Sequence, residues 1–220
     1  MSFTVSIIFQ NDDLIIIDKP ANISFHREKN QPGFFNQLSD YLGFTIWPVH
    51  RLDKVTSGLL IFAKNKVAAS ELTQLFTDKA IHKVYLAISD NKPNKKQGLI
   101  RGDMKKTRNG NWKLTKTQTN PAITQFYSCS LLPGKRFFWV EPQSGKTHQI
   151  RVALKSQGSA ILGDLRYSGS QADRTYLHAY QLKFNWHQQK ICVSCLPQTG
   201  EYFLKPELKT CIEQFENRSN

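Results

Sequence analysis

The sequence of 220 residues has few cysteines, fewer acidic than basic residues, and no long apolar run. The four cysteines (Cys129, Cys192, Cys195 and Cys211) are too few and too scattered for a disulfide-stabilised scaffold. Apolar runs such as residues 14–17 fall far short of the roughly 18 residues that a membrane-spanning helix needs. The first residues show no signal-peptide pattern. We therefore expect a cytoplasmic protein with reduced cysteines.

Cys192 and Cys195 form a single CxxC pair. A structural zinc site needs about four ligands, commonly two such pairs or one pair with two histidines. The second pair is missing, and the surrounding sequence alternates like a β-strand. We predict no metal, with zinc at this pair as the alternative.

The charge is strongly one-sided, with 30 basic and 17 acidic residues and a net charge of +13. Residues 83–136 carry +10 of this charge, against only two acidic residues, Asp90 and Asp103. The basic residues alternate with Asn109, Asn111 and Trp112. Such a segment favours a nucleic-acid partner over a membrane. A solvated, lysine-rich loop is the plain alternative.

Hydrophobic periodicity predicts a mixed α+β domain, because strands and helices do not alternate regularly. The expected strands cover residues 3–9, 13–19, 57–64, 82–89, 123–132, 135–142, 177–184 and 188–195, and the expected helices cover residues 33–43, 66–79 and 147–158.

Capping signals refine the ends of these helices. Asn65 is expected to cap the second helix, with Lys79 and His82 near its carboxyl end. Thr147 is expected to cap the third helix and Gly158 to end it. We predict one domain over residues 1–220, with residues 90–121 as a basic loop or hairpin excursion.

The densest polar cluster beside an apolar strand is HRLDKVTSGLLIFAK, residues 50–64. Arg51 and Asp53 are two residues apart, so both point to one side of an extended segment. Positive neighbours such as Lys54 favour an ionised carboxylate. An ionised carboxylate can serve as nucleophile or base. A structural Asp–Arg pair bracing a turn is the alternative.

This segment resembles the catalytic motif of the RluA-type pseudouridine synthases. Other segments resemble further motifs of that family in the family's order, and together the matches run from about residue 5 to residue 205. They are residues 13–26 around Lys19-Pro20, residues 82–87, residues 145–154, and residues 158–169 followed by residues 177–184.

The resemblance implies a role for each matched residue. Asp53 would be the catalytic aspartate, and Arg51 would help to displace the target uridine. Tyr85 would lie against the flipped base, Arg151 would pair with Asp53, and Ile150 would line the base pocket. The implied fold is a mostly antiparallel mixed sheet flanked by helices, with a central RNA-binding cleft.

The resemblance also implies that no cofactor or metal is needed. We expect a monomer without an S4-type RNA-binding module, acting on tRNA, large-subunit rRNA or both. Two positions depart from the family pattern: Lys146 stands where many relatives have Arg, and Ala153 where many have His. The turn before residue 148 either binds phosphate through free N–H groups or simply caps the helix.

The chemistry is consistent with a single carboxylate. Glycosidases typically use two, one of them to protonate the leaving group. Uracil leaves as a delocalised anion, so hydrogen bonds can replace the acid. Asp53 would then attack the sugar or abstract its 2′-proton, and the sequence leaves both routes open. The target base must first leave its stack, at a cost on the order of a few kcal/mol.

We also assign RNA contacts outside the chemical site, to His50, Lys146, Lys95, Lys96, Lys105 and Lys106. His148 and His178 are expected to be structural, and Asp164 to belong to a turn. One alternative is a catalytically silent RNA-binding protein or chaperone on the same fold. Another is a hydrolase or nuclease that uses Asp53 with His50.

Overall fold

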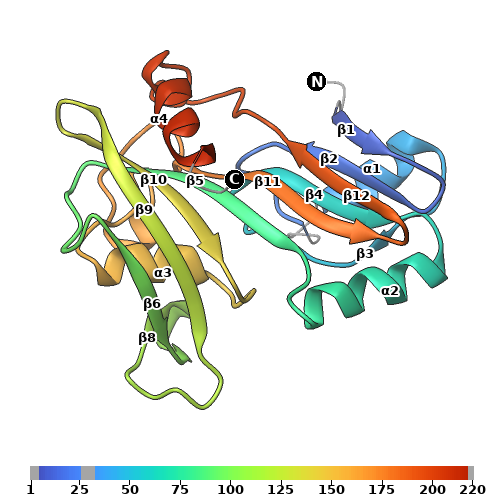
Figure 1. Cartoon of the computed structure of the whole chain (residues 1–220), viewed down its shortest axis with the longest axis horizontal. Coiled ribbons are helices and arrows are strands. Elements are labelled where there is room, and N and C mark those ends of the chain that lie inside the picture. Colours follow the sequence, from blue (N-terminus) through green and yellow to red (C-terminus); the bar gives the residue numbers. More distant parts are fainter. Residues whose placement is uncertain (1–4, 26–32, 218–220) are drawn as a thin grey trace. The chain divides into compact units, whose positions relative to one another are not determined.

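The computed structural model describes residues 5–25 and 33–217, which form two compact α+β units (Figure 1). Unit 1 comprises the described residues up to 82 together with residues 179–196, and unit 2 comprises residues 83–178 and 197–217. The expectation of one catalytic domain stays a prediction. In the described residues, no helix combines the length and the apolar character needed to span a bilayer.

Unit 1 is built around apolar strands that pair antiparallel. Strand β2 lies between β1 and β4, and β12 pairs with β11. Its elements are β1 (Ser6–Gln10), β2 (Leu14–Lys19), α1 (Phe34–Leu42), β3 (Trp47–Pro48), β4 (Ser57–Ala63), α2 (Lys66–Thr77), most of β11 (Leu177–Trp186) and β12 (Gln189–Ser194).

The core of unit 1 lies between this sheet and α2. Leu14 and Ile16 of β2, Leu59 and Ile61 of β4 and Leu72 of α2 belong to one cluster of buried residues. Successive side chains of a strand point to opposite faces, so alternate positions of β2 and β4 reach this cluster. The remaining positions of β4 are buried as well, which makes β4 a rigid support for whatever precedes it.

Unit 2 contains a second antiparallel array in the order β5–β10–β9–β6, and a separate β7–β8 hairpin. Its elements are β5 (His82–Ser89, with His82 at the boundary), β6 (Gln97–Gly102), β7 (Met104–Lys106), η1 (Arg108–Gly110), β8 (Trp112–Leu114), β9 (Ala122–Leu132), β10 (Lys135–Pro142), α3 (Gln149–Ser156), η2 (Leu165–Tyr167) and α4 (Glu207–Glu216).

Helices α3 and α4 pack on opposite faces of the β9–β10 pair (Figure 1). Phe215 of α4 contacts the rings of Phe137 and Trp139 of β10. Gln149 of α3 donates from Nε2 to Thr124 Oγ1 of β9 at 3.0 Å. Even-numbered and odd-numbered side chains of β9 point to opposite faces of the sheet. Thr124 therefore points toward α3, and Cys129 points toward α4.

Most predicted elements are confirmed within a few residues, including the Asn65 cap, whose Oδ1 accepts from Ala68 N at 2.8 Å. Lys79 and His82 follow the carboxyl end of α2 and do not lie in its last turn. The helix stops at Thr77, Lys79 adopts a left-handed backbone with φ of 59°, and His82 begins β5.

Several elements went unpredicted, among them β6 and α4. The excursion over residues 90–121, for which a loop or a hairpin was expected, contains the β7–β8 hairpin, and β6 within it joins the main array as a partner of β9. Only Ile100 and Gly102 of β6 are buried, so its apolar signal is weak. Helix α4 follows the last predicted strand and buries Leu208, Cys211, Ile212 and Phe215.

Candidate active site

Asp53 lies on a tight turn directly before β4. The Thr56 backbone N–H donates to the Asp53 carbonyl oxygen at 3.0 Å, which closes the turn. Leu52 is buried, whereas Arg51 and Lys54 are exposed and Asp53 is half-buried. This alternation agrees with Arg51 and Asp53 sharing a side of the chain. The carboxylate is therefore held on a fixed backbone and is partly accessible.

Lys19 donates a hydrogen bond to the backbone of this turn, a role that was not predicted from the sequence. It is fully buried at the end of β2. Its Nζ donates to the carbonyl oxygens of Pro20 at 2.7 Å, Ile23 at 3.2 Å and Lys54 at 3.4 Å. A buried ammonium requires such acceptors. In the sequence, this role was signalled only by a lysine at the end of the apolar run of β2.

Gly58 fixes the start of β4 against β11. Its φ of +108° disfavours any residue with a side chain. A Cβ at this position would overlap the Ala179 carbonyl oxygen and lie 2.7 Å from the Ala179 nitrogen. The glycine after Ser57 therefore lets two backbones approach closely next to the Asp53 turn.

His50 is tied into the scaffold of unit 1. Its Nε2 accepts from the Ile61 backbone N–H at 2.9 Å, and its ring stacks on Phe76 at a centroid distance of 4.4 Å. Accepting this bond requires the lone pair on Nε2, which a general base would also use. This contact argues against the hydrolase in which His50 serves Asp53.

Arg151 lies in unit 2 and forms a buried two-point ion pair with Asp164. Its Nε donates to Asp164 Oδ2 and its Nη2 to Asp164 Oδ1, both at 2.7 Å. The guanidinium also lies over the Tyr167 ring at 4.9 Å. Asp164 has the expected turn role, because its carbonyl accepts from Tyr167 N and Gly169 N. Its ion pair was missed, and the pairing of Arg151 with Asp53 stays a prediction.

Tyr85 and Ile150, both expected to meet the base, belong to unit 2. Tyr85 is half-buried in β5 and is paired with Val140 of β10. Ile150 lies in the first turn of α3 and is 7% exposed. Tyr85 is thus less buried than Val84 and Leu86 on either side.

The start of α3 differs from the prediction. Thr147 does not cap the helix, which has His148 at its N-cap position with φ of 57° and no side-chain cap bond. Instead Gln149 Oε1 accepts from Lys146 N at 3.0 Å and from Ser144 Oγ at 2.8 Å. The Lys146 backbone N–H is therefore already used, which weakens the phosphate interpretation of this turn.

The expected structural histidines have structural contacts. His148 Nδ1 lies 2.6 Å from the Tyr167 hydroxyl, and burial raises the pKa of Tyr167. His178 is buried, with its ring edge against Phe203.

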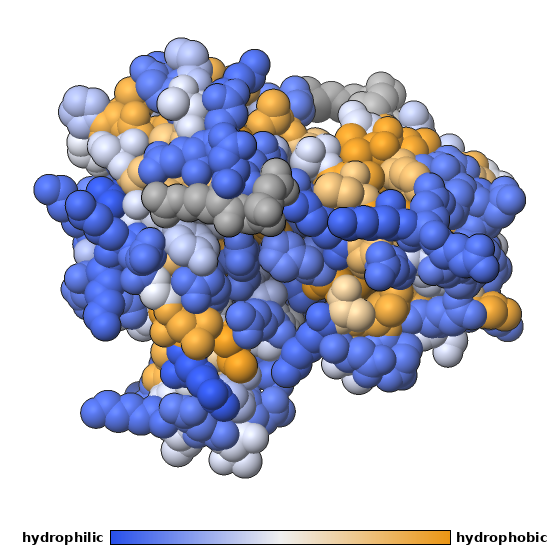
Figure 2. Space-filling view, viewed as in Figure 1, coloured by the Kyte–Doolittle hydropathy of each residue, from blue (hydrophilic) through white to orange (hydrophobic). Residues whose placement is uncertain are grey.

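The excursion presents its lysines to solvent. Lys95 and Lys96 precede β6, and Lys105 and Lys106 lie on β7; all four are exposed. In the hairpin, Lys105 is opposite Lys113. Hydrophilic residues cover most of the face shown in Figure 2. The exposed positions of these four lysines suit a polyanionic partner.

No group of three or more His, Cys, Asp and Glu residues in the described ranges is arranged to hold a metal ion. Cys192 is exposed, and Cys195 is buried. Burial, followed by the nearby Asp18 carboxylate, raises the pKa of Cys195 to about 12. Metal-independent chemistry stays a prediction.

The sequence model described as RNA pseudouridylate synthase matches residues 13–156, well over half of the chain. The chain belongs to this family. An RNA pseudouridine synthase of Haemophilus influenzae, itself uncharacterised, is 50% identical over 215 residues, which are 96% of this chain and 95% of that protein. The family makes the chain an isomerase acting on RNA.

Other pseudouridine synthases are more distant. The ribosomal large subunit pseudouridine synthase C of Rickettsia conorii is 32% identical over 201 residues, covering 86% of this chain but 63% of that protein. The structure of human RNA Pseudouridylate Synthase Domain Containing 1 superposes with a TM-score of 0.76 at 20% identity, covering 97% of this chain and 95% of that one. The second likeness concerns the fold, and the predicted fold class is confirmed.

The synthase residues singled out from the sequence divide between the two units. Arg51, Asp53 and His50 belong to unit 1, on or beside the turn before β4. Unit 2 contains Tyr85, the excursion lysines, and three residues at or beside the start of α3, namely Lys146, Ile150 and Arg151. His26, at the end of the first motif, lies outside the described residues.

Proposed function

We propose that this pseudouridine synthase isomerises a specific uridine in large-subunit rRNA or tRNA, with Asp53 as its catalytic group. The observation that carries the proposal is the Asp53 turn: a half-buried carboxylate on a backbone fixed by Thr56 and Lys19, flanked by exposed Arg51 and Lys54. A group fixed before substrate arrives needs little reorganisation during the reaction. The name of the Rickettsia relative supports rRNA as a target class.

The reaction breaks the bond between ribose C1′ and uracil N1, and the electron pair leaves with uracil. Asp53 either attacks C1′ or removes the 2′-proton. After the base rotates, C5 bonds to C1′; in the first route this displaces Asp53 from C1′, and in the second Asp53 returns the proton to C2′. The C5 proton then leaves to solvent or a base, and N1, which carries no proton in uridine, gains one. We assign Arg51 to the space vacated by the flipped uridine and Tyr85 to the face of the base. Arg151 is assigned to orient Asp53.

Tritium release from RNA labelled at uracil C5 tests this proposal, because only loss of the C5 proton frees the label. Wild-type protein should release tritium without added metal, and Asp53→Asn should release none while still binding RNA. Asp12→Asn is a matched control, because Asp12 is exposed at the β1–β2 turn; it should release tritium normally. Normal release by Asp53→Asn would overturn the assignment. RNA binding without release by the wild type would favour the silent RNA-binding protein.

The basic excursion is proposed as part of the RNA footprint. Each neutralised phosphate contact changes the slope of log affinity against log salt by about 0.7 to 0.9. Replacing Lys95, Lys96, Lys105 and Lys106 with Gln should weaken binding and flatten that slope. The control removes the same charge at exposed positions elsewhere, namely Lys66, Lys79, Lys190 and Lys209. Equal slopes for both variants would remove the excursion from the footprint.

A further inference from the structure

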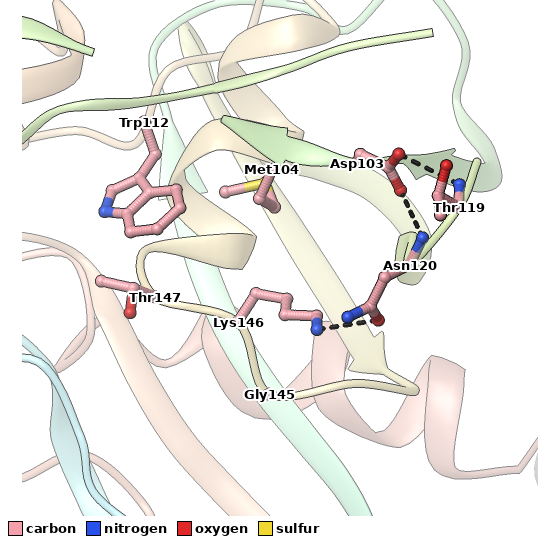
Figure 3. Close-up of a pocket in the computed structure, with 8 residues that line it drawn as sticks. All are labelled: Asp103, Met104, Trp112, Thr119, Asn120, Gly145, Lys146 and Thr147. Carbon is pink, nitrogen blue, oxygen red and sulfur yellow. Dashed lines mark hydrogen bonds between the residues drawn. The ribbon is translucent and has the colours of Figure 1, made fainter. Parts of the chain in front are cut away.

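Unit 2 contains a pocket of about 390 Å³ that plays no part in the chemistry assigned to Asp53 (Figure 3). The β7–β8 hairpin lines one side with Met104 and Trp112, and the turn before α3 lines another with Lys146 and Thr147. Asp103 and Asn120 complete the polar part. The volume is near the lower end of the range for small-molecule sites, so it suits one small ligand.

The hairpin register sets which side chains face the pocket. Lys106 is opposite Trp112, and Met104 is opposite Leu114. Directly opposed residues, and residues two apart on one strand, share a face of a hairpin. Trp112 and Met104, which line the pocket, therefore share one face of the hairpin, and Lys106 belongs to the same face without lining the pocket. The result is an aromatic and apolar surface beside a positive charge.

Trp112 is held by its backbone rather than by its ring. Its N–H donates to the Tyr167 hydroxyl at 3.1 Å, and that hydroxyl is 2.6 Å from His148 Nδ1. The ring lines the pocket and is half-buried, unlike Trp139, which is 1% exposed in the core. A fixed backbone with an open ring face provides a stacking platform.

The polar side of the pocket is preorganised and mixed in charge. Asp103 accepts from Thr119 N at 3.0 Å and Asn120 N at 2.9 Å, and Lys146 Nζ donates to Asn120 Oδ1 at 2.9 Å. Burial alone would raise the pKa of Asp103, but hydrogen bonds from Thr117, Asn120 and Thr119 hold it below its ordinary value. A fixed carboxylate repels a phosphate and accepts from N–H groups. The pocket therefore suits a heterocycle better than an anion.

We propose that this pocket binds a nucleobase of the RNA other than the target uridine, stacked on Trp112 with an amino-bearing edge toward Asp103. Base–aromatic stacking is a general means of holding an unpaired nucleotide. The exposed Lys105 and Lys113 on the other face of the hairpin, with Lys106 opposite Trp112 in the strand register, favour a polyanion over a protein side chain as the source of the stacked ring. This inference rests on the proposed function for its RNA substrate.

Tryptophan fluorescence with short single-stranded oligonucleotides tests the stack. Oligocytidine should quench wild-type emission, and the Trp112→Phe protein should lose most of that quenching. Trp47→Phe, which changes a half-buried tryptophan of unit 1, should keep it. Asp103→Asn should reduce the preference for oligocytidine over oligouridine, because uracil has no exocyclic amino group. Equal quenching of the Trp112→Phe and wild-type proteins would overturn the proposal.

Kinetics separate this subsite from the catalytic proposal. Trp112→Ala should raise KM for RNA by about 5- to 150-fold, the range of one lost base stack, and leave kcat within a few-fold. Trp112→Phe should fall between Trp112→Ala and wild type, which distinguishes a lost stack from a misfolded hairpin. If Trp112→Ala remained active with an unchanged KM for RNA, the proposed subsite would be overturned and the proposed function would stand. No tritium release by wild-type protein would overturn the proposed function, while Trp112-dependent quenching would still support the subsite.

Discussion

Removing the charge of Asp164 should destabilise unit 2 strongly. In Asp164→Asn the side chain keeps its shape, but Arg151 loses the carboxylate that accepts two hydrogen bonds of 2.7 Å. The two side chains are 5% and 2% exposed, so water does not replace the lost partner. Breaking a buried ion pair costs about 3–5 kcal/mol. The amide oxygen still accepts one bond and the Tyr167 ring remains beside the guanidinium, so we expect about 3 kcal/mol.

Urea unfolding followed by fluorescence measures this loss, because the buried Trp139 belongs to unit 2. With a slope of about 2 kcal/mol per molar urea, the midpoint should fall by about 1.5 M. Glu201→Gln is the matched control: its ion pair with Lys205 spans 3.9 Å, and the two side chains are 63% and 42% exposed. That change should cost less than about 1 kcal/mol. If Asp164→Asn lowered the free energy of unfolding no more than Glu201→Gln does, the reasoning would be refuted.

Other predictions concern backbone strain and thiol chemistry. Gly58→Ala should lower the free energy of unfolding by about 2–4 kcal/mol, because its Cβ overlaps Ala179 at positive φ. Gly98→Ala, whose Cβ would lie at an ordinary 3.7 Å from the Phe126 ring, should change it by less than about 1 kcal/mol; similar urea midpoints for both would contradict this. At pH 8 a disulfide reagent should label exposed Cys192 quickly. It should label Cys195 only on unfolding, because a pKa near 12 keeps that thiol protonated; equal labelling rates would contradict this.

Local patterns predicted much of the fold. Apolar runs gave β2, β4 and β5 within a residue or two, and the Asn65 cap gave the start of α2. Helix α4 was also predictable, since its buried residues follow helical spacing. Strand β6 was not, because it contributes little apolar surface and exists through its pairing with β9.

The site was predictable only as far as its motifs. Asp53 was recognised from the motif in residues 50–64. The hydrogen bond from Lys19 Nζ to the Lys54 carbonyl oxygen was not predicted, because the two residues are 35 positions apart in the sequence. The ion pair between Arg151 and Asp164 likewise depends on the tertiary fold. The Trp112 pocket is assembled from several separate segments. Contacts of this kind have no local sequence signal, because neither partner's neighbours specify the other.

The most direct test of the central claim is nucleoside mapping of pseudouridine in cellular RNA. Large-subunit rRNA and tRNA from cells lacking this protein should miss pseudouridine at a specific position. Wild-type protein should restore it, and Asp53→Asn, expressed at the same level, should not. Restoration by Asp53→Asn, or a complete set of pseudouridines in cells without the protein, would contradict the account.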